Sequence, residues 1–104
     1  MEISVNDQSN FTVIKLNKKS VLGDEGAEFQ NSVLNTLDKG VNEIRVDLSM
    51  VEYITSWGIG MLVHAFTTST NRNANFILTG VGKKVFDILS KVRLNSVFTI
   101  REAV

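Results

Sequence analysis

The sequence predicts an α/β domain: a single mixed, largely parallel sheet of about five strands with helices packed mainly on one face. Segments with the apolar period of a strand alternate with segments that have the period of a helix, in the order β-β-α-β-α-β-α-β. Such alternation favours right-handed crossovers between parallel strands. Residues 44–48 also alternate apolar and polar side chains, whereas a parallel strand covered on both faces would be continuously apolar.

Length and composition restrict the class of protein. The 104 residues, 43% of them apolar, suffice for one domain (1–104) with its own core. Eleven basic residues balance eleven acidic ones and there is no cysteine, so we expect no nucleic-acid partner, disulfide or thiolate metal site. No apolar run reaches the roughly 18 residues of a membrane span, and the acidic start is unlike a signal peptide. We therefore expect a soluble, cytoplasmic, single-domain protein.

The first half of the chain predicts a hairpin and a helix. Residues 3–5 and 11–16 have strand patterns on either side of a turn-forming cluster, so we expect them to pair antiparallel. Asp24 can cap a helix that runs to about Lys39, and Gly40 suits the left-handed residue that ends it. The inner face of this helix is marked by Phe29, Val33 and Leu37.

The second half predicts two more helices and two more strands after the strand at residues 44–48. A helix over residues 57–70 has an apolar stripe with the spacing i, i+3, i+4 and i+7, formed by Ile59, Leu62, Val63 and Phe66. The strand expected at residues 76–79 begins with three consecutive apolar residues, Phe76, Ile77 and Leu78, which is typical of a strand inside a sheet. The next helix carries the stripe Val85, Ile88, Leu89 and Val92, and residues 97–100 form the last strand.

Ser56 lies where the chain leaves the sheet and turns into the second helix. A hydroxyl at this position can cap free backbone N–H groups. Those groups and the helix dipole also favour negative charge, so a phosphate added to Ser56 would be tolerated. Trp57, the sole tryptophan, is either a packing residue or an anchor for a partner, since tryptophan is frequent among interface hot spots. Gly58 and Gly60 are expected to let the helix start approach a strand closely.

Residues suited to catalysis or metal binding are few. His64 is the only histidine, no orienting acid or nucleophile accompanies it locally, and one histidine without cysteines is a poor metal site. The glycines at 58–60 and 80–82 are too closely spaced for a dinucleotide or phosphate-binding loop. We therefore expect no cofactor and no enzymatic activity. A deep pocket beside His64 with a carboxylate in reach would reverse that expectation.

Together these residues resemble the STAS domain family, which includes the bacterial anti-sigma factor antagonists. The resemblance covers nearly the whole chain: the hairpin, the strand at 44–48, the Ser-x-Gly-Ile-Gly turn that begins at Ser56, and the tail 85–100. It implies a STAS-like fold, with one sheet and helices on one side of it.

The resemblance also implies a function, that of an anti-anti-sigma factor in a partner-switching pathway. An anti-sigma factor that is also a serine/threonine kinase binds the unphosphorylated antagonist and phosphorylates a serine at the start of the second helix. A phosphatase reverses the modification. The matching serine in this chain is Ser56. The residues expected to contact the partner are Thr55, Ser56, Trp57, Gly58, Ile59 and Asp24.

Two departures from the family's usual Asp-Ser-[Ser or Thr]-Gly motif leave an alternative open. Thr55 stands where the aspartate would be, and Trp57 stands where the second small residue would be. The alternative is a STAS-type interaction module, such as a scaffold or a transporter-associated subunit, that binds constitutively and is not phosphorylated.

Overall fold

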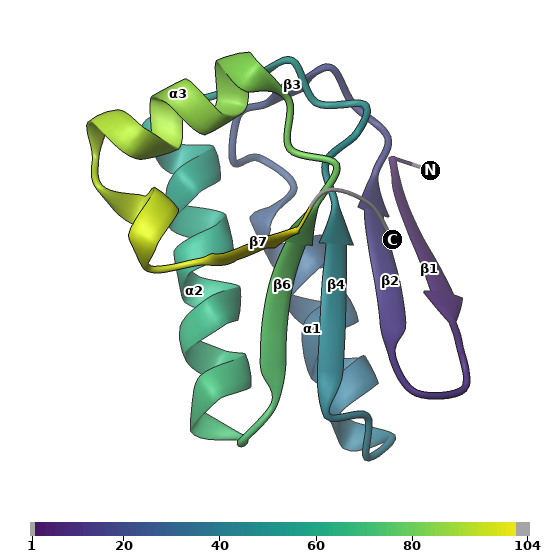
Figure 1. Cartoon of the computed structure of the whole chain (residues 1–104). Coiled ribbons are helices and arrows are strands. Elements are labelled where there is room, and N and C mark those ends of the chain that lie inside the picture. Colours follow the sequence, from purple (N-terminus) through teal and green to yellow (C-terminus); the bar gives the residue numbers. More distant parts are fainter. Residues whose placement is uncertain (1, 102–104) are drawn as a thin grey trace.

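Five strands form the main sheet in the order β1-β2-β4-β6-β7 (Figure 1). The computed structural model describes residues 2–101. Its main strands are β1 (Ile3–Asp7), β2 (Thr12–Leu16), β4 (Glu43–Asp47), β6 (Asn75–Thr79) and β7 (Thr99–Arg101). β1 and β2 pair antiparallel, and every other neighbouring pair in this sheet is parallel. The predicted mixed, largely parallel sheet with one antiparallel hairpin is confirmed.

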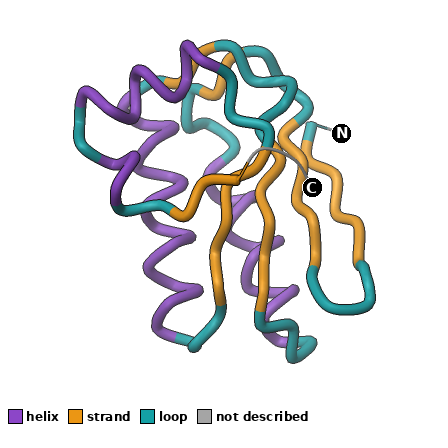
Figure 2. The backbone as a smooth tube through the Cα atoms, viewed as in Figure 1, coloured by secondary structure: helices purple, strands orange, loops and turns teal. Residues whose placement is uncertain are grey.

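Two of the helices cover one face of this sheet, as predicted. They are α1 (Gly26–Asp38) and α2 (Ser56–Asn71), and both lie on the same side of the strands in Figure 1. The third, α3 (Lys83–Lys91), lies near the carboxyl ends of the parallel strands and is followed by the short 3-10 helix η1 (Leu94–Ser96). The loop that leads into α2 lies at this same end of the sheet (Figure 2).

Side-chain burial follows the alternation seen in the sequence. Ile44 and Val46 on β4 are fully buried in the core beneath the helices, whereas Arg45 and Asp47 are partly exposed on the opposite face. On that opposite face the guanidinium of Arg45 lies 3.7 Å from the ring centroid of Phe11. The alternation of apolar and polar residues along β4 therefore predicted correctly which face of the sheet the helices cover.

A second, two-stranded parallel sheet was not predicted. It consists of β3 (Ser20–Val21) and β5 (Tyr53–Ile54), with Val21 opposite Ile54. The backbone N–H of Glu52 donates to the carbonyl of Lys19 (2.7 Å), and that of Thr55 donates to the carbonyl of Val21 (3.0 Å). This small sheet joins the loop after β2 to the loop before α2, and it is what positions the start of α2.

The inner face of α2 differs by about one residue from the predicted stripe. Its buried residues are Gly58, Met61, Leu62, Ala65 and Ser69. Of the predicted stripe only Leu62 is fully buried, because Ile59, Val63 and Phe66 lie at the edge of the buried face. Phe66 packs edge-on against Phe98 near β7, with 5.5 Å between ring centroids. The apolar arc of α2 is wide because this helix contacts both the sheet and the segment that leads to β7.

Three predicted boundaries were wrong. The N-cap of α1 is Glu25 and not Asp24, whose side chain does not cap the helix. Val92 follows the end of α3 and is 53% exposed, so it does not belong to the inner stripe. The last strand begins at Thr99 and not at residue 97, because the N–H groups of Val97 and Phe98 donate to the carbonyl of Leu94 in the turn that follows η1. The end of α1 is as predicted, since Gly40 has φ of +88° and its N–H donates to the carbonyl of Leu37.

Candidate functional site

Thr55, and not Ser56, caps α2. Thr55 has extended backbone angles (φ −88°, ψ 171°), and its Oγ1 accepts a hydrogen bond of 3.1 Å from the N–H of Gly58. The same hydroxyl donates to the carbonyl oxygen of Leu22 at 3.0 Å. Thr55 therefore ties the helix start to the loop after β3. The prediction that the Ser56 hydroxyl forms the cap was wrong by one residue, because the helix begins at Ser56 itself.

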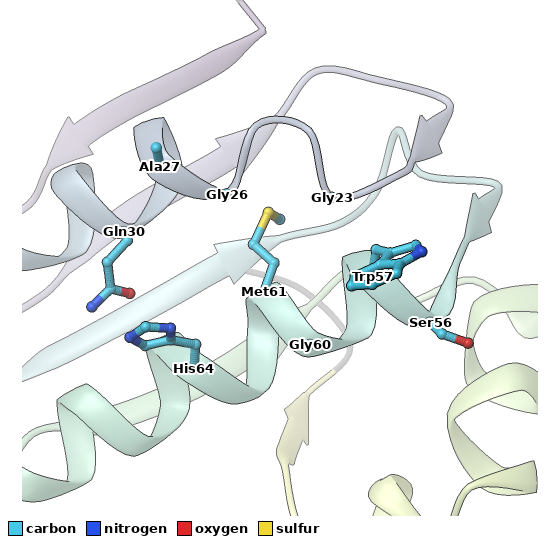
Figure 3. A pocket seen from close by; sticks show the side chains of 9 residues that line it. All are labelled: Gly23, Gly26, Ala27, Gln30, Ser56, Trp57, Gly60, Met61 and His64. Atoms are coloured by element: carbon cyan, nitrogen blue, oxygen red, sulfur yellow. The ribbon is translucent and has the colours of Figure 1, made fainter.

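Ser56 and Trp57 form the exposed first turn of α2. Ser56 is exposed, and among residues 2–101 no hydrogen bond joins its hydroxyl to another protein group. Trp57 is 80% exposed, a large apolar side chain almost entirely in solvent. Figure 3 shows the Ser56 hydroxyl pointing away from α1, on the other side of the helix start from the indole. Such exposure rules out the packing role that the sequence left open for Trp57.

Two glycines bring the backbone close beneath this turn. A Cβ at Gly58 would lie 2.5 Å from the carbonyl oxygen of Val21, so only glycine lets α2 approach β3 this closely. Gly23 has φ of +99°, and a Cβ there would lie 2.6 Å from the Cβ of Trp57. Gly60, in contrast, has open space where a Cβ would be, so the predicted close packing holds for Gly58 and not for Gly60.

A groove of about 690 Å³ runs between α1 and α2 on one side of Trp57 (Figure 3). We call it the α1–α2 groove, and it is lined by Gly23, Gly26, Ala27, Gln30, Ser56, Trp57, Gly60, Met61 and His64. Its walls are mostly apolar or small, and His64 is exposed at the end away from Ser56. No aspartate or glutamate is among these lining residues, so His64 lacks the neighbouring carboxylate that general acid–base chemistry would require.

A second depression of about 430 Å³ lies between the start of α2 and α3. We call it the α3 hollow, and it is lined by Tyr53, Ile54, Thr55, Ser56, Trp57, Ile59, Ile88, Lys91 and Val92. Tyr53 and Val92 are both 53% exposed. Ser56 and Trp57 therefore form a ridge with an apolar depression on each side, a shape suited to docking against another protein.

The loop before α1 is held against this ridge by a buried carboxylate. Glu25 Oε2 accepts a hydrogen bond of 2.6 Å from Lys18 Nζ, while its Oε1 accepts one of 3.1 Å from the N–H of Gly23. The Glu25 side chain is only 8% exposed. This hydrogen bond to Glu25 raises the pKa of Lys18 above its ordinary value. Asp24 is exposed beside this pair, with Oδ1 3.6 Å from Lys18 Nζ.

Neither a metal-binding cluster nor a membrane-spanning helix is found in the described part of the chain. Between residues 2 and 101 no three His, Cys, Asp or Glu side chains gather in a way that could hold a metal ion. Nor does that part of the chain contain a helix that combines the length and the apolarity needed to cross a membrane. The exposed ridge at Ser56 and Trp57 is thus the strongest candidate site.

The fold and this ridge define an α/β domain with an exposed turn at the start of one helix. The chain belongs to the STAS domain family, whose family model matches residues 2–104. Among curated proteins it is similar to the anti-sigma-B factor antagonist of Listeria monocytogenes, with 29% identity over 58 residues. The match covers 56% of this chain and 51% of that protein, so the chain spans about half the length of the curated relatives it matches.

Solved structures show the same fold. The NMR structure of TM1081 from Thermotoga maritima has a TM-score of 0.84 at 25% identity, covering 95% of this chain and 79% of that one. The anti-sigma factor antagonist SpoIIAA of Bacillus, in its unphosphorylated form, has a TM-score of 0.75 at 13% identity, covering 98% and 89%. Its phosphorylated form gives 0.74 at 12% identity, covering 98% and 91%. At these identities the likeness to SpoIIAA is one of fold.

Proposed function

We propose that this protein is an anti-sigma factor antagonist controlled by phosphorylation of Ser56. In its unphosphorylated form it binds an anti-sigma factor that is a serine/threonine kinase. Transfer of the γ-phosphoryl group of ATP to the Ser56 oxygen, with loss of the hydroxyl proton and departure of ADP, ends the complex. A phosphatase acting on phospho-Ser56 restores binding. The observation that carries the proposal is the exposed Ser56 hydroxyl at the first residue of α2, beside an indole that is 80% exposed.

The relatives support this proposal. The Listeria protein is named an anti-sigma-B factor antagonist, and SpoIIAA, which shares this fold, has been solved both with and without phosphorylation. A phosphate on Ser56 would add about −1.5 to −2 charges, which the N-terminal end of a helix tolerates. A partner surface packed over Trp57 would not tolerate it if that surface were apolar or acidic. The modification would therefore abolish binding and leave the domain folded.

The six proposed docking residues divide by their exposure. Ser56, Trp57 and Asp24 are exposed and can contact a partner directly. Ile59 is partly buried in the wall of the α3 hollow. The remaining two residues, Thr55 and Gly58, support the docking face indirectly. Thr55 caps the helix, and Gly58 is buried against Val21. We therefore expect substitutions at Thr55 and Gly58 to alter the docking face through its shape.

The direct test uses the purified chain, its cognate anti-sigma kinase and labelled ATP. Ser56→Ala should abolish incorporation of label while leaving complex formation intact, and Ser56→Asp should abolish the complex. Ser9→Ala, in the exposed β1–β2 turn at the far end of the sheet, is the matched control and should be labelled normally. Label retained in Ser56→Ala would refute the site. Undiminished binding of Ser56→Asp would favour the constitutive interaction module instead.

Trp57 should be the main anchor of the complex. Trp57→Ala is expected to weaken partner binding by about 30-fold or more, the loss typical of an interface hot spot worth about 2 kcal/mol. The same change should leave the free energy of unfolding within about 0.5 kcal/mol, because the side chain is exposed in the free protein. Calorimetric titration and urea unfolding measure the two quantities. Val5→Ala, an exposed apolar residue on β1, is the control, and equal affinities of both variants would exclude the anchor role.

A further inference from the structure

Lys91 is the only charged residue among those that line the α3 hollow. It lies in the last turn of α3, on the opposite wall of the hollow from Ser56 and Trp57. The other lining residues are apolar or uncharged at neutral pH, and Tyr53 is the only other titratable group among them. The basic group of this hollow thus comes from an element 35 positions further along the chain than Ser56.

The Ser56 hydroxyl faces the side of this hollow. In Figure 3 its oxygen points away from the α1–α2 groove, toward the pale green ribbon of α3. Lys91 is exposed and takes part in none of the salt bridges found within residues 2–101. Lys83 of the same helix is already paired with Asp87, at 3.0 Å. Lys91 is therefore available to an anion that enters the hollow.

We propose that Lys91 binds the phosphate of phospho-Ser56 within the same chain. This inference rests on the proposed function, since it assigns the place that the phosphate takes once it has been added. Ile59 and Ile88, both partly buried, give the hollow an apolar wall, and a charge pair beside an apolar wall is stronger than one surrounded by water. The phosphate would then fill part of the hollow and neutralise its only cation, so that a partner loses both features together.

A structural role for Lys91 must be separated from this one. A lysine in the last turn of a helix interacts favourably with the helix dipole, and that effect does not require a phosphate. The decisive measurement must therefore report on the phosphate itself. The second pKa of phosphoserine, ordinarily near 6, is such a quantity, because a neighbouring cation stabilises the dianion and lowers this pKa.

The experiment places phosphoserine at position 56 during translation, so that no kinase is needed, and follows its titration by ³¹P NMR. With Lys91 present, the second pKa should lie about 0.2 to 0.7 units below its value in Lys91→Met, the range that corresponds to measured exposed ion pairs. Lys91→Arg should retain the shift. Lys84→Met, an exposed lysine of α3 outside the hollow, should also retain it. In 1 M salt the difference between the unaltered protein and Lys91→Met should shrink.

Equal pKa values for the phosphate in the unaltered and Lys91→Met proteins would overturn the proposal. A shift lost equally in Lys91→Met and Lys84→Met would also overturn it, by showing a general effect of net charge. These outcomes are independent of the proposed function, which fails if the cognate kinase does not label Ser56. Thermal unfolding of the unphosphorylated Lys91→Met variant measures separately how much the interaction of Lys91 with the helix dipole contributes to stability.

Discussion

At the scale of single residues, the turn into α2 divides two tasks between adjacent hydroxyls. Thr55 uses its oxygen twice, accepting from Gly58 and donating to Leu22. The hydroxyl of Ser56 is therefore not needed to cap the helix, and Ser56 is exposed. A residue that both capped the helix and received a phosphate would lose the cap on modification. The phosphorylation of Ser56 proposed above would therefore leave the cap at the start of α2 in place.

Removal of the Thr55 cap should therefore destabilise the domain, whereas removal of the Ser56 hydroxyl should not. Thr55→Ala is expected to lower the free energy of unfolding by about 1 kcal/mol, the usual cost of losing an N-cap. Thr55→Ser restores the capping oxygen and should recover most of the loss. Ser56→Ala should change stability by less than about 0.5 kcal/mol. Urea unfolding of the three variants tests this, and equal losses at both positions would contradict the assignment.

The sequence could not separate these two residues because both carry hydroxyls suitable for a cap. The choice depends on which one has extended backbone angles, and that is set by the β3–β5 pairing just before it. The exposure of the Trp57 indole could not be predicted from the sequence either, since it depends on how Gly23 packs against this residue. In contrast, the location of the turn itself followed directly from the strand pattern before it and the helix pattern after it.

At the scale of elements, the packing of α2 onto the small sheet depends on one of the two glycines near the start of this helix. Gly58 faces the carbonyl of Val21 and the side chain of Ile54, while Gly60 faces open space on the groove side. The two positions therefore differ in what a methyl group would meet, although both lie in the same turn of the same helix.

Alanine at these two positions should have opposite effects on stability. Gly58→Ala is expected to cost about 1–3 kcal/mol, because its Cβ would lie 2.5 Å from a backbone oxygen and force α2 away from β3. Gly60→Ala should stabilise by about 0.5–1 kcal/mol through helix propensity. Thermal unfolding measures both changes. Destabilisation of similar size at both positions would show that the close approach at Gly58 is not what requires glycine.

Element prediction succeeded where periodicity was long and failed where segments were short. The strand at residues 44–48 and the hairpin were recognisable because alternation extended over several residues. β3 and β5 each contain two residues, too few to show a period, and they pair across 33 positions of the chain. The face of α2 was misjudged by one residue because apolar side chains occupy a wide arc of this helix.

At the scale of the whole molecule, the candidate site lies at one end of the sheet, near the carboxyl ends of its parallel strands. The alternation in β4 was sufficient to predict which side the helices cover, since a one-residue shift would have exposed Ile44 and Val46. The connection between Lys18 and Glu25 could not be predicted, because nothing in the sequence indicates that two exposed-looking charges would meet at 2.6 Å.

The ion pair between Lys18 and Glu25 should make the free energy of unfolding decrease at alkaline pH. The pKa of Lys18 is raised in the folded protein above its ordinary value of 10.5, chiefly by the hydrogen bond to Glu25. Its contribution to stability is therefore fully present below pH 10.5 and is lost as the pH rises through the raised value. Urea unfolding at about pH 8 and about pH 11 should show a larger loss for the unaltered protein than for Lys18→Met. Identical pH dependence of the two proteins would exclude this linkage.

The small β3–β5 sheet has a consequence for how the docking face can be imitated or blocked. Gly23 and Asp24 lie just after β3 and Trp57 lies just after β5, and the β3–β5 pairing with the hydrogen bonds beside it brings them together. A linear peptide copied from residues 52–60 would lack the support for its indole and should not compete for the partner.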